Sequence, residues 1–326
     1  MKVLISTVPF GSVPNHDPLG LLEAARVRYQ LNPFGRRLTE PELVELIHDV
    51  SILIAGTEPI TTEVMEAAPQ LRLIARVGIG LDSVDLEAAR MRGIAVTYTP
   101  EAPAPAVAEL TVGLMLDLLR SISRADRLMH SKHWRRFLGR RLDGLTVGVL
   151  GVGRVGKRVI RILRGGFPNV RILANDIQPD FSFGEELGIE WVEKNKLYAN
   201  SDIVTLHLPL TQITNRLITE REIGMMKPSA FIINTSRGGI VDESALATAL
   251  TSGCLAGAAI DVFDREPYSG VLTDIEPCIL TCHMGSMSED CRAAMETEAL
   301  EDVLRFVRGD PLKQPVPEVE YTVSKR

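Results

Sequence analysis

Residues 151–156 read Gly-Val-Gly-Arg-Val-Gly, and the sequence on both sides of this stretch gives it its meaning. The apolar run Leu145–Leu150 precedes it and is typical of a strand in a parallel sheet. A helical pattern follows over Gly153–Leu163, and Asp176 comes twenty positions after Gly156. A glycine turn between a strand and a helix, with an acid about 20 residues further on, predicts a dinucleotide-binding fold.

In such a turn the glycines let the backbone bend sharply and approach a pyrophosphate, while N–H groups at the start of the helix bind the phosphates. The residues expected to contact the cofactor here are Gly151, Gly153, Arg154, Val155 and Gly156. Asp176 would accept hydrogen bonds from the adenosine ribose and repel a 2′-phosphate, and residues 177–179 (Ile-Gln-Pro) supply no compensating arginine. The sequence therefore favours NAD over NADP, although an acid here is also an ordinary turn residue after a strand.

Composition limits the class of protein. The chain has 326 residues, of which 45% are hydrophobic and 24% charged, and this indicates a globular protein of roughly two domains. Its net charge of −6 does not favour nucleic acid or an anionic membrane as a partner. No uncharged apolar run approaches the ~18 residues of a membrane span, and the apolar N-terminal run ends at Pro9, too early for a signal peptide.

Four cysteines without regular spacing indicate reduced thiols, so we expect a cytoplasmic protein. Cys278, Cys282 and His283 lie close together in the sequence, which is one pattern of a metal site. They lack the paired Cys-x-x-Cys spacing of structural zinc, and we therefore expect no metal.

Apolar, strand-like runs alternate with helical patterns in two series, which predicts an α/β fold with two doubly wound parallel-sheet domains. The first series has expected strands at Val3–Ser6, Arg28–Leu31, Ser51–Ala55, Leu71–Ala75 and Ile94–Tyr98. The second series has them at Leu145–Leu150, Arg171–Asn175, Ile203–Leu206, Ala230–Asn234, Ala256–Asp261 and Cys278–Thr281.

The connections between the series define the domains. A single long helix is expected over residues 105–130, a second over residues 288–307, and an extended tail after Gly309. We predict that a Rossmann NAD-binding domain, residues 102–288, is inserted in a flavodoxin-like substrate-binding domain formed by residues 1–101 and 289–326. A small ligand is expected between two such units.

Three segments beyond the glycine turn resemble the D-isomer-specific 2-hydroxyacid dehydrogenase family, and the resemblance covers nearly the whole chain. They are residues 233–239 (Ile-Asn-Thr-Ser-Arg-Gly-Gly), 261–267 (Asp-Val-Phe-Asp-Arg-Glu-Pro) and 281–286 (Thr-Cys-His-Met-Gly-Ser). The pattern is most similar to 3-phosphoglycerate dehydrogenase-like members without a regulatory domain, since the chain ends soon after its last helical stretch. The resemblance implies an NAD-dependent enzyme that transfers a hydride between NAD(H) and a small 2-hydroxy or 2-oxo acid.

The resemblance places the catalytic roles on Arg237, Glu266 and His283. Hydride transfer to a 2-oxo acid builds negative charge on the carbonyl oxygen, and His283 would protonate that oxygen as general acid and act as base in reverse. Glu266 would bind the other ring nitrogen and stabilise the imidazolium. Arg237 would bind the substrate carboxylate and carbonyl with its planar guanidinium. Taken singly, each of the three is also typical of an ordinary packed or solvated side chain.

The resemblance also implies binding residues. Asp261 would hold the nicotinamide carboxamide, and further cofactor contacts would come from His207, Pro209, Thr235 and Gly285. Residues 76–82 (Arg-Val-Gly-Ile-Gly-Leu-Asp) look like the family's substrate-carboxylate loop. In that loop the substrate would be bound by Arg76 and by the backbone N–H groups of Val77 and Gly78, because glycine lets the backbone come close.

Some positions depart from the family pattern. Cys282 precedes His283 where proline is usual, and Pro103 replaces an asparagine with which phosphoglycerate enzymes bind substrate, whereas Arg76 matches an arginine that they use. The basic run over residues 132–141 is either a solvated face or an anion site that reaches a neighbouring subunit, because the family forms homodimers through the 105–130 region. We therefore hypothesise a substrate with a second anionic group.

Two alternatives stay open. Related enzymes oxidise phosphite or formate, and Glu266 argues against formate because formate enzymes pair their histidine with glutamine. A relative of the C-terminal-binding corepressors would instead use NAD to assemble rather than to catalyse, and such proteins keep the same three residues.

Overall fold

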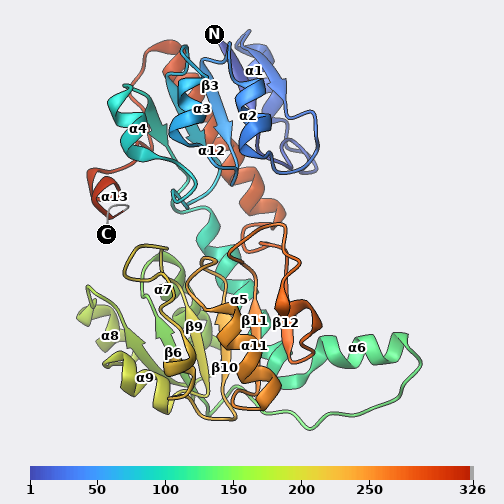
Figure 1. The fold of residues 1–326 in the computed structure, drawn as a ribbon. Helices are drawn as coiled ribbons and strands as arrows, with labels where there is room; N and C mark the ends of the chain where they lie inside the picture. The colour runs from blue at the N-terminus through green and yellow to red at the C-terminus, as the bar shows by residue number, and fades with distance from the viewer. Residues whose placement is uncertain (324–326) are drawn as a thin grey trace. The chain divides into compact units, whose positions relative to one another are not determined.

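The computed structural model describes residues 1–323, and the chain divides into two compact units (Figure 1). One unit consists of Met1–Pro103 together with Ser286–Arg326, and the other of Ala104–Gly285. The second unit is thus an insertion in the first, and each unit has its own parallel sheet. Among the residues described, no helix combines the length and the apolar character needed to cross a membrane.

The inserted unit is built on a seven-stranded parallel sheet in the order β12-β11-β10-β9-β6-β7-β8. Its first strand, β6, lies inside the sheet, and the chain adds strands first on one side of it and then on the other. This is the strand order of the Rossmann fold, extended by one strand. The strands are β6 (Thr146–Leu150), β7 (Arg171–Asn175), β8 (Ile189–Trp191), β9 (Ile203–Leu206), β10 (Phe231–Asn234), β11 (Gly257–Ile260) and β12 (Cys278–Leu280).

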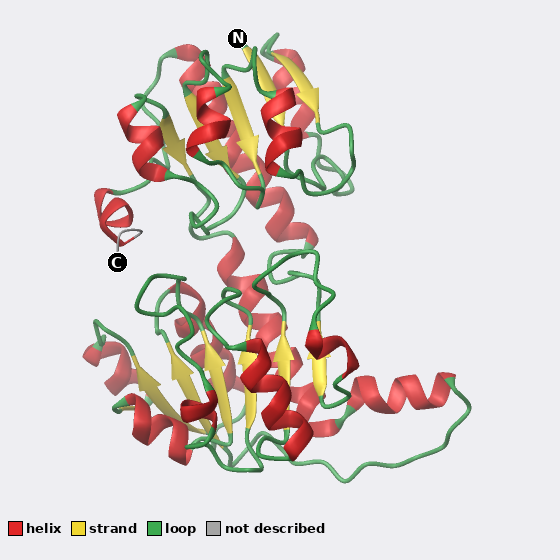
Figure 2. Cartoon of the chain, in the orientation of Figure 1, coloured by secondary structure: helices red, strands yellow, loops and turns green. Residues whose placement is uncertain are grey.

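Helices cover both faces of this sheet (Figure 2), because successive strand residues point to opposite sides. Ile233 of β10 packs in the cluster with α5 (Pro103–Arg120) and α7 (Arg154–Gly166). Its neighbour Ile232 packs in the opposite cluster with α9 (Lys194–Asn200) and α11 (Glu243–Ser252). The shorter elements of the unit are α8 (Phe181–Leu187), α10 (Glu220–Ile223) and the 3-10 turn η1 (Val271–Asp274).

The first unit has a five-stranded parallel sheet in the order β2-β1-β3-β4-β5, which is the flavodoxin-like order. The strands are β1 (Lys2–Ile5), β2 (Arg28–Leu31), β3 (Ile52–Ala55), β4 (Leu73–Arg76) and β5 (Ala95–Thr97), and the connecting helices are α1 (Pro18–Ala24), α2 (Glu40–Leu46), α3 (Thr62–Glu66) and α4 (Leu86–Met91). The long helix α12 (Glu289–Arg308) packs against β3 and β4. The predicted fold class, two doubly wound parallel sheets with a Rossmann unit inserted in a flavodoxin-like one, is confirmed.

The tail after Gly309 is more ordered than the sequence predicts. Asp302, buried on α12, accepts the backbone N–H groups of Lys313 at 2.5 Å and Gln314 at 3.0 Å. This fixes the tail beside β5, where Pro315 pairs antiparallel with Thr97, and α13 (Glu318–Val323) follows. The prediction of an extended tail is therefore wrong for α13.

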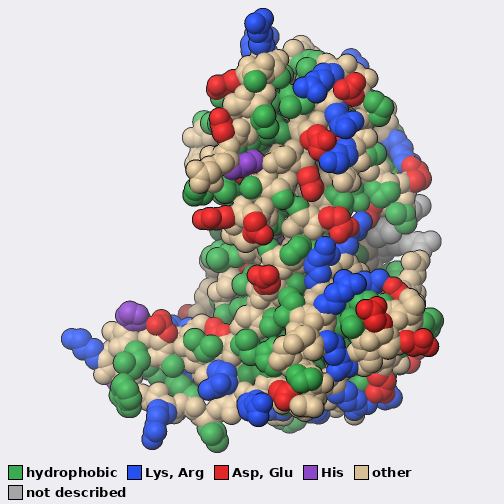
Figure 3. Space-filling model, turned by 180° about the vertical axis from the view of Figure 1, so that it is seen from behind, with side chains coloured by type: hydrophobic (Ala, Val, Ile, Leu, Met, Phe, Trp, Pro, Cys, Tyr) green, Lys and Arg blue, Asp and Glu red, His purple; other side chains and the backbone are tan. Residues whose placement is uncertain are grey.

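The predicted single helix over residues 105–130 is interrupted. Ser121 adopts a left-handed conformation (φ 52°) and separates α5 from α6 (Ile122–His130). The Asp117 carboxylate accepts the N–H of Ser123 at 2.8 Å and so begins a new helix in another direction. Helix α6 has no buried residue, and together with residues 131–139 it projects from the inserted unit as an arm (Figures 1 and 2). Lys and Arg side chains lie along this arm at the lower left of Figure 3.

Candidate active site

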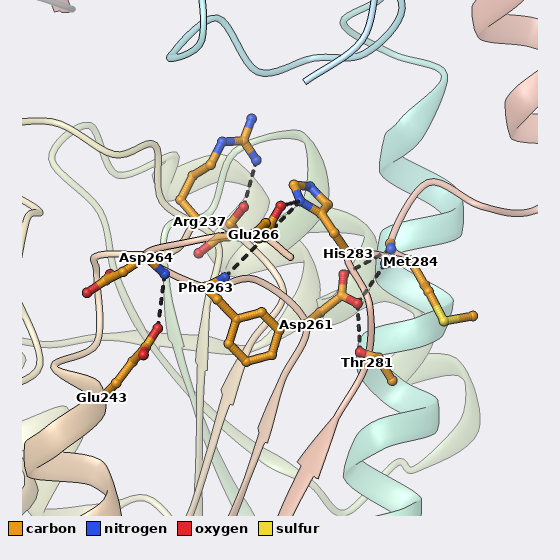
Figure 4. Close-up of polar contacts among 11 residues, drawn as sticks. Arg237, Glu243, Asp261, Phe263, Asp264, Glu266, Thr281, His283 and Met284 are labelled. Carbon is orange, nitrogen blue, oxygen red and sulfur yellow. Dashed lines mark hydrogen bonds and ion pairs between the residues drawn. The ribbon is translucent and has the colours of Figure 1, made fainter. Parts of the chain in front are cut away.

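The three predicted catalytic residues follow three neighbouring strands. Arg237 comes after β10, Glu266 after β11 and His283 after β12, and these strands are adjacent in the sheet. In a parallel sheet the carboxyl ends of neighbouring strands meet at one edge, where ligands bind. Figure 4 shows the three side chains beyond the strand ends, with the ring of His283 turned to the carboxylate of Glu266.

The His283 imidazole and the Glu266 carboxylate form a hydrogen-bonded pair. Nδ1 of His283 lies 2.9 Å from Oε2 and 3.1 Å from Oε1 of Glu266. The carboxylate is also fixed by the N–H of Phe263 at 3.1 Å, and the Phe263 ring stacks on Tyr268 with centroids 4.0 Å apart. An ionised carboxylate can only accept hydrogen bonds, so the ring nitrogen that faces Glu266, Nδ1, must carry a hydrogen. Nε2 is then the nitrogen that can exchange a proton with a ligand.

Arg237 belongs to a turn that its own strand organises. Oδ1 of Asn234 accepts the N–H of Ser236 at 3.1 Å, and its Nδ2 donates to the carbonyl of Arg237 at 2.8 Å. The guanidinium donates to the carbonyl of Ser236 at 2.6 Å. The preceding Thr235 is buried, and its hydroxyl lies 2.8 Å from that of Thr111 on α5. The turn is therefore anchored to both the strand and the helix behind it.

Asp261 is fully buried at the end of β11 and contacts the His283 turn. Its carboxylate accepts the Thr281 hydroxyl at 2.6 Å and the N–H groups of Met284 at 2.7 Å and Gly285 at 2.9 Å. Its carbonyl accepts the N–H of His283 at 2.8 Å. The role predicted for Asp261, holding a nicotinamide carboxamide, stays a prediction, whereas these four contacts lie within the protein.

The glycine turn lies at the switch point of the sheet, between β6 and β9, where the direction of chain progression reverses. Gly151 has a φ of +88°, and a Cβ there would lie 2.3 Å from the carbonyl oxygen of His207. A Cβ on Gly156 would lie 2.1 Å from the Gly151 carbonyl oxygen. Both positions exclude any larger residue, and Gly153 is the N-cap of α7, with Arg154 and Val155 in its first turn. These residues fit the pyrophosphate of a dinucleotide, because the turn presents backbone N–H groups and the positive end of a helix.

Asp176 follows β7 beside this turn. One carboxylate oxygen accepts the N–H of Val152 at 2.7 Å, and the other accepts the N–H of Gln178 at 2.8 Å. The acid thus organises the glycine turn in addition to any contact with a ribose. Ile177 is 96% exposed, and residues 177–179 bring no arginine to this position.

His207 and Pro209 follow β9 on the other side of the switch point. Burial lowers the pKa of His207 to about 3, so its ring is neutral. Its Nε2 lies 3.0 Å from the hydroxyl of Thr205. The carbonyl of Pro209 accepts the Thr214 hydroxyl at 2.6 Å, which closes the loop after β9. A neutral imidazole beside the turn adds no positive charge there.

In the first unit, the loop after β4 differs in detail from the prediction. The N–H of Val77 donates to the carbonyl of Ala55 at 2.9 Å, and that of Gly78 donates to the Thr99 hydroxyl at 2.8 Å. Both groups therefore have acceptors inside the unit, and the expectation that they bind an anion stays a prediction. Arg76 is buried, and its guanidinium donates to the carbonyl of Val77.

The fold and the glycine turn define a dinucleotide-binding α/β protein, and comparison with known proteins specifies the family. The model of the D-isomer specific 2-hydroxyacid dehydrogenase NAD binding domain matches residues 112–285, more than half of the chain. A D-3-phosphoglycerate dehydrogenase of Methanocaldococcus jannaschii is 38% identical over 279 residues, which cover 84% of this chain and 53% of that protein. A glyoxylate reductase of Thermococcus litoralis is 36% identical over 279 residues, covering 82% of this chain and 84% of the relative.

Among solved structures, a protein of Thermus thermophilus superposes with a TM-score of 0.88 at 33% identity, covering 97% of this chain and 100% of that one. The chain therefore belongs to the D-isomer specific 2-hydroxyacid dehydrogenase family. It is an NAD-dependent oxidoreductase of 2-hydroxy and 2-oxo acids, and the predicted family, enzyme class and cofactor are confirmed. The chain spans about half the length of the Methanocaldococcus relative.

Several contacts at the site could not be predicted from the motifs. The N–H donors of Phe263, Met284 and Gly285 leave no signal in the sequence, because every residue except proline carries a backbone N–H group. Thr281 is the first residue of the 281–286 motif, so the sequence identifies its hydroxyl as a possible donor but not the acceptor. Its partner, Asp261, is 20 residues away along the chain and adjacent only across β11 and β12.

Proposed function

We propose that this enzyme reduces a small 2-oxo acid to the D-2-hydroxy acid with NADH, using His283 as general acid, Glu266 as its partner and Arg237 as the anion-binding group. The observation that carries the proposal is the 2.9 Å contact between His283 and Glu266. These residues follow β12 and β11, and Arg237 follows β10, the next strand of the same sheet. When bound, NADH supplies the hydride.

The residues supply the remaining chemistry. As the substrate carbonyl gains a hydride at carbon, its oxygen gains negative charge and takes the proton from Nε2 of His283. Glu266 keeps Nδ1 of His283 occupied, so Nε2 is left to face the substrate. Arg237 binds the substrate carboxylate and stabilises the charge that develops on the neighbouring oxygen. Asp261 holds the carboxamide of the cofactor, and Thr235 and Gly285 line the same side.

For the first unit we propose substrate binding by the loop after β4, with a change from the residues predicted. Among residues 1–323, the N–H groups of Ile79 and Gly80 donate to no protein acceptor, whereas those of Val77 and Gly78 are used. Ile79 and Gly80 are therefore the better candidates for the substrate carboxylate. Arg76 and Gly78 shape the loop, because a Cβ on Gly78 (φ +143°) would lie 2.3 Å from the Arg76 guanidinium.

We propose a cytoplasmic homodimer in which the arm, α6 with residues 131–139, docks on a second copy. Two large apolar side chains of the arm, Trp134 and Leu138, are 82% and 104% exposed. The basic run over residues 132–141, most of which belongs to the arm, would then lie near the partner's substrate and favour an acid with a second anionic group. Arg135→Ala with Arg136→Ala would raise the KM for a substrate of that kind, and an unchanged KM for each such acid would exclude this role.

A panel of 2-oxo acids tests the proposed function, with glyoxylate, hydroxypyruvate, pyruvate and 3-phosphohydroxypyruvate as substrates and loss of NADH absorbance as the readout. We expect turnover with at least one acid, and His283→Asn should abolish it while NADH still binds. His48→Asn is the matched control, since His48 is exposed in the first unit, where its Nδ1 lies 3.1 Å from the Ala67 carbonyl. NADH binding without turnover of any acid would favour the corepressor-like alternative. Turnover of phosphite alone would favour the alternative of a phosphite dehydrogenase.

A further inference from the structure

The His283 turn has an unusual backbone conformation for a residue with a side chain. His283 has a φ of +52°, in the left-handed region that residues other than glycine seldom adopt. Such a conformation persists only where surrounding contacts determine it. The ring direction of His283 follows from this backbone, so whatever holds the backbone also aims the ring at Glu266.

Four donors from the turn converge on Asp261. The Thr281 hydroxyl and the Met284 N–H share one carboxylate oxygen, the Gly285 N–H uses the other, and the His283 N–H uses the main-chain carbonyl. Donors therefore stand on both sides of His283 in the chain. A carboxylate that accepts several hydrogen bonds in a buried place is a strong acceptor, because its charge is poorly screened there.

The turn is also packed from behind. A Cβ on Gly285 would lie 3.1 Å from Cγ2 of Val107 on α5 and 3.4 Å from Oδ2 of Asp261. The segment after β11 holds the other partner too, since the Phe263 N–H donates to Glu266. Residues 261–263 thus fix the histidine turn and the carboxylate that the histidine meets (Figure 4).

We propose that the Thr281 hydroxyl, through the Asp261 carboxylate, is a positioning device that holds His283 in the conformation in which its ring meets Glu266. This inference rests on the proposed role of His283 as the proton donor. It gives Asp261 a function toward the catalytic turn in addition to the one toward the cofactor. Thr281 precedes His283 by two residues, and its hydroxyl donates to the Asp261 carboxylate (Figure 4).

The test is Thr281→Val, which keeps the shape of the side chain and removes its hydroxyl. A displacement of a catalytic group by about 1 Å can cost about a hundredfold in rate, so we expect kcat for reduction to fall between about tenfold and a hundredfold. KM for the 2-oxo acid and Kd for NADH should stay at the wild-type values.

Rescue and control variants separate positioning from general damage. Thr281→Ser restores the hydroxyl and should restore kcat. Thr248→Val removes a comparable hydroxyl bond, to the Ser244 carbonyl on the exposed face of α11, and should leave kcat unchanged. If Thr281→Val does not fold, as judged by circular dichroism, Thr281→Ala takes its place and is compared with the serine variant.

Two results would overturn the proposal. A wild-type kcat in Thr281→Val shows that the hydroxyl does not position the turn. A weaker Kd for NADH with kcat preserved assigns Thr281 and Asp261 to cofactor binding alone. Neither result bears on the proposed function, which His283→Asn tests: an inactive His283→Asn with an unaffected Thr281→Val leaves the proton donor in place and rejects only the positioning device.

Discussion

Nδ1 of His283 and Oε2 of Glu266 lie 2.9 Å apart although 17 residues separate them in the chain. The contact depends on the parallel pairing of β11 with β12, which brings the two following loops together. The imidazole side chain is 33% exposed and the carboxylate side chain 19%, so the pair is partly shielded from water. A hydrogen bond to a carboxylate is stronger where water is partly excluded, so Glu266 has a large influence on the orientation of the His283 ring.

Glu266→Gln should lower the activity of reduction. Glutamine keeps the shape of the side chain and removes its charge, so the hydrogen bond that orients the His283 ring through Nδ1 is weakened. Proton transfer by a positioned group contributes about 10²–10⁴-fold, and we expect a loss of kcat/KM within that range, to be measured by steady-state kinetics with NADH and a 2-oxo acid. Glu243→Gln is the control, since Glu243 accepts the N–H of Asp264 in the same loop at 3.0 Å without contacting His283. A wild-type kcat/KM in Glu266→Gln contradicts the role given to the pair.

Asp176→Ser should weaken the binding of NADH and reduce the enzyme's preference for NADH over NADPH. The carboxylate repels a 2′-phosphate, and its removal relieves this repulsion. It also accepts the N–H of Val152, so the glycine turn loses a contact and NADH itself binds less well. The measurement is kcat/KM for both cofactors, with Glu190→Gln as the control because Glu190 is in the same unit and pairs with Arg171 at 2.5 Å. Better turnover of wild type with NADPH than with NADH would contradict the assignment.

Every strand that the sequence predicted is present in the structure. Predicted and observed bounds agree for residues 28–31, 171–175 and 203–206, and the other predicted strands differ by only a few residues at their ends. The short strand β8, by contrast, is half-buried at the edge of the sheet, and its three residues carry no alternation that distinguishes it from a loop. Helices α5 and α6 were predicted as one helix because a serine at position 121 does not by itself indicate a helix end. The break accompanies the left-handed conformation of Ser121 and the hydrogen bond from Ser123 to Asp117.

The site residues were predictable only as types. Arg237, Glu266 and His283 stand in recognisable segments, and the structure adds their partners without testing their roles. Backbone groups were the weak point, since sequence gives no indication of whether an N–H is used in a ladder. Val77 is an example: its N–H pairs with Ala55 of the neighbouring strand β3, a consequence of register that no local motif contains.

The four cysteines should differ in reactivity toward iodoacetamide. Burial raises the pKa of Cys278 to about 12 and that of Cys291 to about 11, so at pH near 8 almost none of either is thiolate, the reactive form. Cys254 and Cys282 are exposed and should be labelled first, as mass spectrometry of timed samples would show. Labelling of Cys282 should inactivate the enzyme because it precedes His283, and Cys282→Ser should resist. Equal labelling of Cys278 and Cys254 would contradict this order.

The arm is fixed at its base and exposed along its length. The N–H of Arg140 donates to the carbonyl of Leu119 at 3.0 Å, so the two ends of the arm are joined. Arg124, near the start of α6, pairs with Glu276 at 2.9 Å. Phe137 lies under the guanidinium groups of Arg124 and Arg135, at 4.5 and 5.0 Å. The arm therefore has a defined shape in a single chain while its large apolar side chains remain in solvent, as is typical of a surface that a second chain covers.

Trp134→Ser combined with Leu138→Ser should convert the proposed dimer to a monomer. A central tryptophan in an interface contributes about 2 kcal/mol or more, which corresponds to a rise in the dimer dissociation constant of at least about thirtyfold. Sedimentation equilibrium over a concentration series measures it directly. The control is Met91→Ser, since Met91 is 73% exposed on α4 of the other unit and outside the arm. A wild-type protein that sediments as a monomer at all concentrations, or a double variant that dimerises as tightly as wild type, would show that the arm does not join two copies.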